Sequence, residues 1–199
     1  MEPLSTEQKI IQAASRLFSE KGYAATRLRD ISQESDTNLA LINYYFRSKE
    51  NLFKMVIKQK IEQLFGSLNP LLADESIELK EKVTLLVNTY TTLLLENGDL
   101  ALFVLNEMRT NQNMLAPLLK IARLSALPVI QKQLDEAAID ITPADFIMNV
   151  LSLIIFPFVS KALFVSAGMF KEEEFEEFVL SRKEKMQGWI IQSLKKKTV

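Results

Sequence analysis

The chain has 199 residues, of which 48 % are hydrophobic and 25 % charged, a balance typical of a folded globular protein. Five Gly and six Pro are too few for a loop-rich or all-β fold. Cysteine and histidine are both absent, which excludes disulfides, Cys/His zinc sites and catalysis by a histidine base or triad. A carboxylate-only active site remains open, but no spacing of acidic residues indicates one. We therefore expect no enzyme activity, no metal and no cofactor.

Charge is unevenly divided along the chain, although the total is only −1. Residues 1–60 contain ten Lys and Arg against seven Asp and Glu, a net charge of +3, which leaves −4 for residues 61–199. A mildly basic head on an acidic body is compatible with a head that touches nucleic acid. Residues 1–5 lack the basic start and apolar stretch of a signal peptide, so we expect a cytoplasmic protein.

The first predicted helix begins after Ser5, which together with Gln8 has the spacing of a capping box. Gly22 is typical of a left-handed helix stop, and Thr26 is predicted to cap a second, short helix. The first helix has one apolar face, because hydrophobic residues recur every three or four positions. That face comprises Ile10, Ile11, Ala14, Leu17 and Phe18.

A turn at residues 35–38 separates the second helix from a third one at residues 39–45. Asp36 tolerates the left-handed backbone region, and Asn38 can cap the third helix. Two short helices about four residues apart have the spacing of a helix-turn-helix. Ser48 is then expected to cap a fourth, long amphipathic helix that extends to residue 68.

The remaining residues, 71–199, are predicted to form a second helical domain after a linker at residues 71–76. Thr142-Pro143-Ala144-Asp145 is a strong helix start, with a cap, a proline at the first position and an acidic residue in the first turn. The predicted helices of this domain cover residues 79–96, 99–109, 115–138, 143–167 and 172–196. The whole chain is therefore predicted to be all-α, with about nine helices and no confident strand.

The segment from Phe146 to Phe170 is long enough to span a bilayer. Polar residues inside it, among them Asn149 and Lys161, and acidic flanks instead favour a buried helix at an oligomer interface. We expect no membrane association.

Several short motifs follow one another in the first quarter of the chain. In order they are Ile-x-x-Ala-Ala-x-x-Leu-Phe from Ile10, Gly22-Tyr23, Thr26, Arg29-Asp30-Ile31, Leu41-Ile42, Tyr44-Tyr45-Phe46 and Ser48-Lys49-Glu50-Asn51-Leu52-Phe53. As a set they resemble the N-terminal DNA-binding domain of TetR-family transcriptional regulators, over residues 8–53. The resemblance implies a DNA-binding domain at residues 1–50, a connecting helix at 48–68, and an effector-binding and dimerisation domain at 71–199.

By this resemblance the recognition helix is Asn38–Tyr44, with Ile42 and Phe46 packing against the rest of the domain. Tyr44, Tyr45 and Lys49 are expected to contact phosphates, and Thr26 to bind one through its hydroxyl and the free N–H groups of the second helix. The implied DNA-binding set is Thr26, Arg27, Arg29, Thr37, Asn38, Leu39, Ala40, Leu41, Asn43, Tyr44, Tyr45 and Lys49.

The chain departs from the family pattern at a few of these positions. Asp36 stands where glycine is usual, and Asn43 replaces a common tyrosine. Leu39 and Leu41 replace residues that are often polar, so they can pack on thymine methyl groups but read no donors or acceptors.

In the second domain, the resemblance implies an unidentified small-molecule effector and a homodimer formed by helices 143–167 and 172–196. Candidate effector-binding residues are Tyr90, Phe103, Asn106, Glu107, Met108, Met148, Asn149, Ser152, Phe156 and Lys161. The implied function is a repressor that binds a pseudo-palindromic operator in double-stranded DNA and is released by its effector. The alternative is a helical protein-interaction module without DNA binding, since residues 1–50 carry seven basic and seven acidic side chains.

Overall fold

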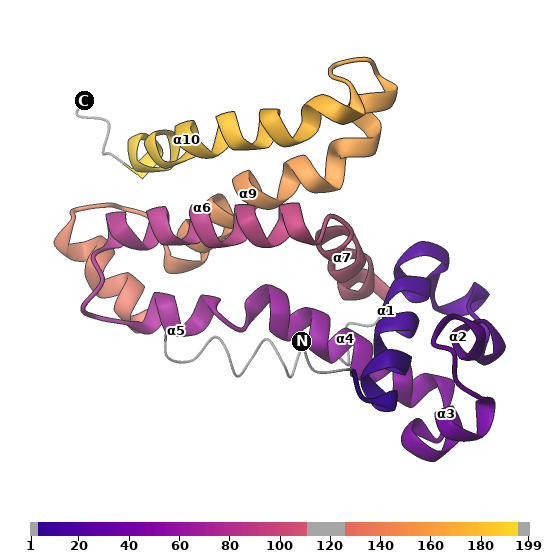
Figure 1. The fold of residues 1–199 in the computed structure, drawn as a ribbon. Helices are drawn as coiled ribbons and strands as arrows, with labels where there is room; N and C mark the ends of the chain where they lie inside the picture. Colours follow the sequence, from indigo (N-terminus) through magenta and orange to yellow (C-terminus); the bar gives the residue numbers. More distant parts are fainter. Residues whose placement is uncertain (1–3, 111–125, 195–199) are drawn as a thin grey trace. The chain divides into compact units, whose positions relative to one another are not determined.

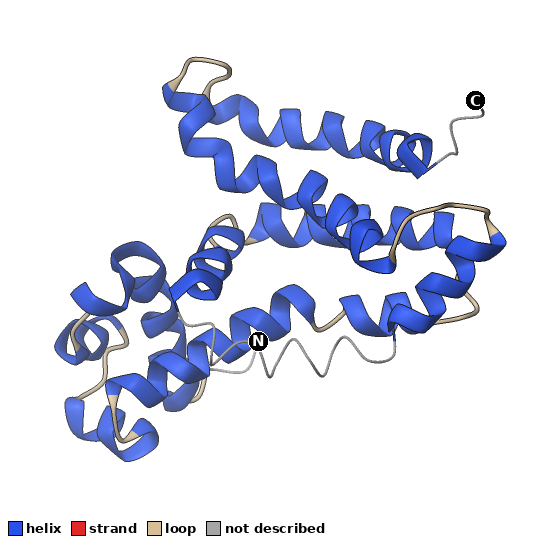
Figure 2. Cartoon of the chain, turned by 180° about the vertical axis from the view of Figure 1, so that it is seen from behind, coloured by secondary structure: helices blue, strands red, loops and turns tan. Residues whose placement is uncertain are grey.

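The computed structural model describes residues 4–110 and 126–194, and within these ranges every regular element is a helix (Figures 1 and 2). This confirms the predicted all-α class. The chain divides into two compact units, Met1–Glu62 and Gln63–Val199.

The N-terminal unit begins with three helices, α1 (Thr6–Ala25), α2 (Leu28–Glu34) and α3 (Leu39–Phe46). Helix α1 contacts both α2 and α3, and α2 contacts α3. The predicted apolar face of α1 is buried except for Ile11, which is half-buried. The core of the unit comprises Ile10, Ala14, Leu17, Phe18, Ile31, Ile42, Phe46, Leu52 and Phe53.

Predicted caps fix the ends of these helices. Ser5 and Gln8 form the capping box of α1, with hydrogen bonds of 2.9 and 3.2 Å between side chain and backbone. The Asn38 side chain accepts a hydrogen bond from the Leu41 N–H (2.9 Å) at the start of α3. Asp36, in the turn before it, has a φ of 49°, which confirms the predicted left-handed conformation.

The corner between α1 and α2 differs from the prediction. Gly22 has a positive φ of 76°, as expected of a helix stop, but the helical assignment resumes after this kink and continues to Ala25. Thr26 ends α1 and does not cap α2. The cap position belongs to Arg27, whose backbone N–H donates to the Asp30 carboxylate (3.0 Å).

Helix α4 (Lys49–Phe65) follows α3 directly. Ser48 caps it as predicted, because its hydroxyl accepts from the Asn51 N–H (3.1 Å). The helix ends before residue 68, and a short helix, α5 (Leu68–Ala73), occupies part of the segment predicted to be a linker.

The C-terminal unit is built around α6 (Leu79–Glu96), which contacts α5, α9 (Pro143–Ser166) and α10 (Phe175–Leu194). Helix α7 (Leu100–Thr110) packs on α9, residues 126–136 are helical, and a 3₁₀ turn, η1 (Glu172–Glu174), precedes α10. The first part of the helix predicted at 115–138 lies outside the described residues. The buried apolar side chains of α6, Val83, Leu86, Val87, Tyr90 and Leu94, form the middle of this core.

A buried lysine joins three parts of the C-terminal unit. The Lys82 ammonium on α6 donates to the Leu72 carbonyl of α5 and to the Gln133 side-chain oxygen, both at 2.9 Å. The Gln133 amide in turn donates to the Ile77 carbonyl (2.8 Å). Burial lowers the pKa of Lys82, but these acceptors satisfy the donors that the core would otherwise leave without partners.

Candidate nucleic-acid interface

Helix α3 has one face that packs and one that remains outside. Ile42 and Phe46 are almost fully buried, as predicted. The residues between them point away from the core, and Tyr44 is 78 % exposed. Tyr44 and Tyr45 lie edge to face, with ring centroids 5.2 Å apart. An exposed tyrosine pair at the end of a short, firmly anchored helix places two phenol hydroxyls where an external acceptor can reach them.

The rest of the predicted groove-facing set lies on α3 and the turn before it. Asn38, Ala40 and Asn43 are exposed, whereas Leu39 and Leu41 are half-buried. Thr37 is also half-buried, and its hydroxyl shares a hydrogen bond of 2.7 Å with that of Ser35. The structure therefore brings these residues together on one short segment, with the two leucines partly engaged in packing.

Thr26 is the one member of the predicted set that the structure withdraws from the surface. Its side chain is fully buried, and its hydroxyl donates to the carbonyls of Gly22 (2.8 Å) and Leu17 (3.1 Å). A hydroxyl has a single proton, and here carbonyls of α1 already take it. In this conformation the hydroxyl proton is therefore not available to a phosphate, and Thr26 anchors the corner that carries α2. A phosphate contact through the backbone N–H groups at the start of α2 stays a prediction.

The basic residues near α3 differ in how firmly they are held. Arg27 and Arg29 are exposed at the start of α2. Lys49 is half-buried at the start of α4, and its ammonium lies 4.3 Å from the centroid of the Tyr23 ring. Arg47, between α3 and α4, is exposed and has a φ of 65°.

Arg47 was missing from the predicted site set, although it follows the three aromatic residues directly. Its exposed guanidinium lies in the same stretch as Tyr45 and Lys49. A non-glycine residue with positive φ is a strained conformation that functional sites often retain. From the sequence, only the charge of Arg47 and its position after the aromatic residues could have indicated a role in the site. A positive φ can be expected from sequence only at glycine, asparagine and aspartate.

Within the described residues, the candidate effector-binding residues differ in burial and lie on several helices. Tyr90, Phe103 and Glu107 are buried in the C-terminal unit, and Lys161 is half-buried. The side chain of Met108 lies outside the described residues. The others are exposed on the surface of α7 or α9, namely Asn106, Met148, Asn149, Ser152 and Phe156. Their role in effector binding stays a prediction.

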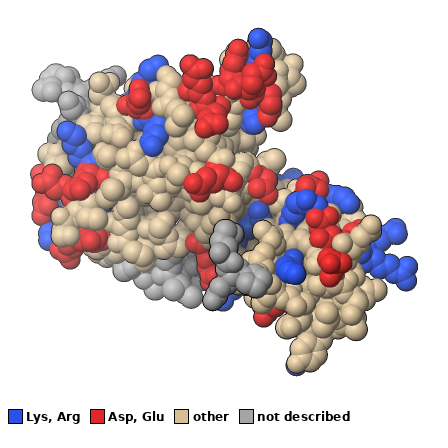
Figure 3. All heavy atoms as spheres, viewed as in Figure 1, with Lys and Arg blue, Asp and Glu red and all other residues tan. Residues whose placement is uncertain are grey.

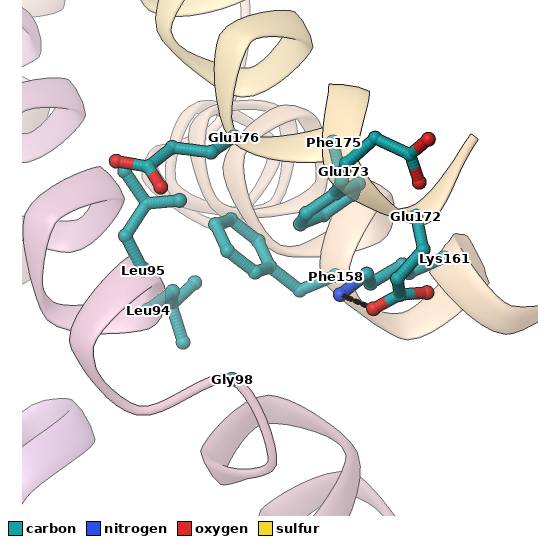
Figure 4. Close-up of a pocket in the computed structure, with 9 residues that line it drawn as sticks. All are labelled: Leu94, Leu95, Gly98, Phe158, Lys161, Glu172, Glu173, Phe175 and Glu176. Carbon is teal, nitrogen blue, oxygen red and sulfur yellow. Dashed lines mark ion pairs between the residues drawn. The ribbon is translucent and has the colours of Figure 1, made fainter. Parts of the chain in front are cut away.

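Within the described residues, a pocket of the C-terminal unit has a volume of about 340 Å³. Figure 4 shows Phe158 and Phe175 with Leu94 and Leu95 along its wall and acidic side chains at its rim. Lys161 is the single predicted effector residue on it, and it is held there by an ion pair with Glu172 and by the Phe175 ring, 4.7 Å from its ammonium. Its lining residues are Leu94, Leu95, Gly98, Phe158, Lys161, Glu172, Glu173, Phe175 and Glu176. Figure 3 shows the acidic side chains gathered in this part of the unit.

A second feature of the C-terminal unit is an apolar face that the unit itself does not cover. On α9, Met148 is 69 % exposed, Phe156 58 % and Leu163 66 %. On α10, Phe178 and Trp189 are also exposed, and their spacing of 11 residues places them on one side of that helix. By length and composition α9 would suffice to cross a membrane, and only 33 % of its most apolar stretch is buried in the chain. Exposed apolar surface on two neighbouring helices is typical of an interaction site.

Comparison with known proteins gives this geometry a context. Residues 10–56 match the family model described as "Bacterial regulatory proteins, tetR family". The probable HTH-type transcriptional regulator YttP of Bacillus subtilis (strain 168) is 23 % identical over 193 residues, which cover 94 % of this chain and 93 % of YttP.

Two solved structures have the same fold. HlyIIR, a hemolysin II transcriptional regulator, superposes with a TM-score of 0.67 at 22 % identity, over 96 % of this chain and 98 % of HlyIIR. FadR of Bacillus subtilis, solved in complex with stearoyl-CoA, gives a TM-score of 0.64 at 19 % identity, over 89 % of this chain and 95 % of that chain.

Proposed function

Because the chain belongs to the tetR family of bacterial regulatory proteins, we propose that it binds a pseudo-palindromic operator as a homodimer and is released from it by a small molecule. The observation that carries the proposal is α3, a short helix buried on one side through Ile42 and Phe46 and exposed on the other. A helix-turn-helix uses such a helix to enter the major groove while neighbouring groups hold phosphates.

The phosphate contacts are assigned to Tyr44, Tyr45, Lys49 and the arginines beside them, Arg27, Arg29 and Arg47. The two tyrosines offer hydroxyl donors, and the lysine and arginines offer charge. These contacts fix the position of the head on the duplex but carry no sequence information. Thr26 is left out of the contacts, since its hydroxyl is used inside the unit.

Base reading is assigned to Thr37, Asn38, Leu39, Ala40, Leu41 and Asn43. Asn43 is exposed and could bond to adenine through its amide. Asn38 uses its side-chain oxygen to cap α3, which leaves its amide nitrogen as the reading group. The two leucines are only half-exposed and would contact thymine methyl groups at most.

The homodimer is assigned to the apolar face of α9 and α10. Two copies of one face pack on each other in a two-fold dimer, so exposed Phe156, Leu163 and Trp189 would be covered by the same surface of the second copy. Two heads held in this way match the two halves of a palindromic site. Burial against a second copy also accounts for an apolar helix such as α9 without a bilayer.

Effector release is assigned to the C-terminal unit. FadR, a structural neighbour, binds stearoyl-CoA, and this chain shares its fold. The buried Tyr90 hydroxyl makes no hydrogen bond of standard geometry within the described residues, and only the Ser67 side chain interacts with it, so a polar ligand group could supply a full partner. An effector acts only if it binds the free and DNA-bound arrangements with different affinity.

Repression is the proposed mode, since occupancy of the operator by the dimer is sufficient to exclude other proteins from that DNA. Such a regulator works in the cytoplasm, and no enzymatic step is part of the proposal.

A salt titration of DNA binding tests the proposal. The protein is titrated onto a mixed-sequence duplex at several salt concentrations, and the slope of log affinity against log salt is measured. Lys49→Ala should weaken binding at low salt and lower the slope by roughly 0.9 per head, because each phosphate contact releases counterions. Lys58→Ala is the matched control, an exposed lysine further along the same helix.

An unchanged slope for Lys49→Ala would refute the phosphate contact. A wild-type protein that fails to bind any duplex at low salt would refute the DNA-binding function and favour the protein-interaction alternative.

A further inference from the structure

We propose that Tyr23 is a positioning residue for DNA binding, whose ring holds the Lys49 ammonium at the start of α4 in the place where it meets a phosphate. The inference rests on the proposed DNA-binding function. It assigns a role to a residue that touches no DNA itself.

The Tyr23 ring is fixed by a cluster of aromatic side chains. Its centroid lies 4.5 Å from that of Phe53 and 6.0 Å from that of Phe18. Phe18 and Phe53 are themselves buried and in edge-to-face contact at 4.9 Å. The ring thus has one side against the core, while the residue is 37 % exposed and reaches the surface.

The chain path that brings Tyr23 to α4 depends on Gly22. Its φ of 76° turns the backbone out of the regular helix one residue before the tyrosine. No atom lies within 4 Å of the position that a Cβ would occupy, so the backbone angle, not space, calls for glycine. The kink at Gly22 and the aromatic cluster together fix the position of the Tyr23 ring.

The Lys49 ammonium lies 4.3 Å from the centroid of this ring, within the range of a cation–π interaction. The position needs such support, because a cation in the first turn of a helix faces the positive end of the helix dipole. Glu50 is the neighbouring carboxylate, but it pairs with Lys54. Within the described residues no carboxylate forms an ion pair with Lys49, so the ring is its main partner.

An aromatic partner leaves the positive charge of Lys49 available to DNA, which a carboxylate partner would not do. A carboxylate would neutralise the lysine, and a phosphate would then have to compete with it. The ring orients the ammonium through its negative face and leaves the full positive charge available. A side chain that is held in place before binding also loses less conformational freedom when the phosphate arrives.

A double-mutant cycle on DNA binding tests the role of Tyr23. Tyr23→Leu should weaken binding of the mixed-sequence duplex by about two- to fivefold per head, which is the range of an exposed cation–π interaction. Tyr23→Phe retains the ring and should bind within a factor of about two of the wild type. In a Lys49→Ala background, Tyr23→Leu should have no further effect, because the side chain it positions is gone.

A second measurement examines the free protein without DNA. The ε-methylene protons of Lys49 should show an upfield NMR shift from the Tyr23 ring, retained in Tyr23→Phe and lost in Tyr23→Leu. This readout remains usable if Tyr23→Leu is too unstable for binding assays, since wild type and Tyr23→Phe suffice to detect the shift.

Several results would overturn the inference. Equal weakening by Tyr23→Leu with and without Lys49 would make Tyr23 a merely structural residue. Random-coil shifts for the Lys49 ε-protons would show that the ring does not hold the ammonium in solution. If Lys49→Ala weakens binding but Tyr23→Leu does not, the inference fails while the proposed function stands. If the wild-type protein binds no duplex, both the inference and the proposed DNA-binding function are refuted.

Discussion

Thr26 illustrates how a single hydroxyl can serve the fold where a contact with DNA was predicted. Its side chain is fully buried and bonds to carbonyls in the last turns of α1. A buried hydroxyl of this kind orients the start of α2, and therefore Arg27 and Arg29, without touching a ligand. Arg47 shows the opposite behaviour, with an exposed charge in a strained backbone conformation.

Replacing Thr26 by valine should therefore lower the free energy of unfolding. Valine has nearly the same shape but no hydroxyl, so the carbonyls of Leu17 and Gly22 lose a hydrogen bond, at a cost of about 1–2 kcal/mol. Urea unfolding measures the change, and Thr26→Ser, which keeps the hydroxyl, is the control. A Thr26→Val protein of normal stability but reduced salt slope would instead restore the phosphate role.

Helix ends could be predicted from the sequence where the residues that fix them lie close together along the chain. The caps formed by Ser5, Asn38 and Ser48 involve partners three residues away, so the sequence alone identifies them. Helix α3 and its two packing residues, Ile42 and Phe46, were also predictable, because a short run of motifs defines them.

Features that depend on distant parts of the chain were not predictable. Thr26 bonds to a carbonyl nine residues earlier across a kink, and Lys49 meets the ring of Tyr23 on another helix. The pocket beside Lys161 arises where α6, α9 and η1 converge, which depends on the faces that these helices turn toward each other. Helical periodicity places residues on a face but does not determine which face meets which helix.

Helix α6 carries a buried tyrosine that should make stability depend on pH in the alkaline range. Burial raises the pKa of Tyr90 to about 12, from 10.0 in its ordinary state. The unfolded chain therefore loses this proton at lower pH than the folded chain does. The stabilising contribution is complete below pH 10 and decreases as the pH rises toward 12, by a total of about 2–3 kcal/mol.

Unfolding by urea at pH 9 and at pH 11.5 measures this effect, with Tyr90→Phe as the comparison. Lys82 on the same helix acts in the opposite direction, because burial lowers its pKa and the folded state gains stability as the lysine of the unfolded chain loses its proton. Both proteins retain Lys82, so the difference between them isolates Tyr90. The wild type should lose more stability than Tyr90→Phe, and an equal loss would contradict the account.

For the whole molecule, the apolar face of α9 and α10 is the feature that requires a partner. Its exposed residues recur along α9 from Met148 through Phe156 to Leu163, on one side of the helix. A second copy of the same face would bury them and place two heads on one duplex. Under the proposed function, the N-terminal unit would bind DNA and the C-terminal unit would form the dimer and bind the effector.

Leu163→Glu should convert the dimer to a monomer at micromolar concentration. A carboxylate placed in the apolar interface must be desolvated, and dimer affinity should fall by at least about tenfold. Sedimentation equilibrium measures the change. Leu102→Glu is a matched control, because Leu102 is a leucine of similar exposure on α7, outside this face. Equal oligomeric states for Leu163→Glu and the wild type would assign the dimer to another surface.

Selection of bound duplexes from a random pool tests whether α3 reads DNA as one of two symmetric copies. The purified protein, refolded to remove any bound effector, is incubated with the pool at low salt, and the retained duplexes are sequenced. We expect a palindromic consensus whose half-sites lie about one helical turn apart, centre to centre, or a multiple of that distance. Enrichment of a single, non-repeated half-site would contradict the symmetric dimer, and no enrichment at all would contradict sequence reading by this helix.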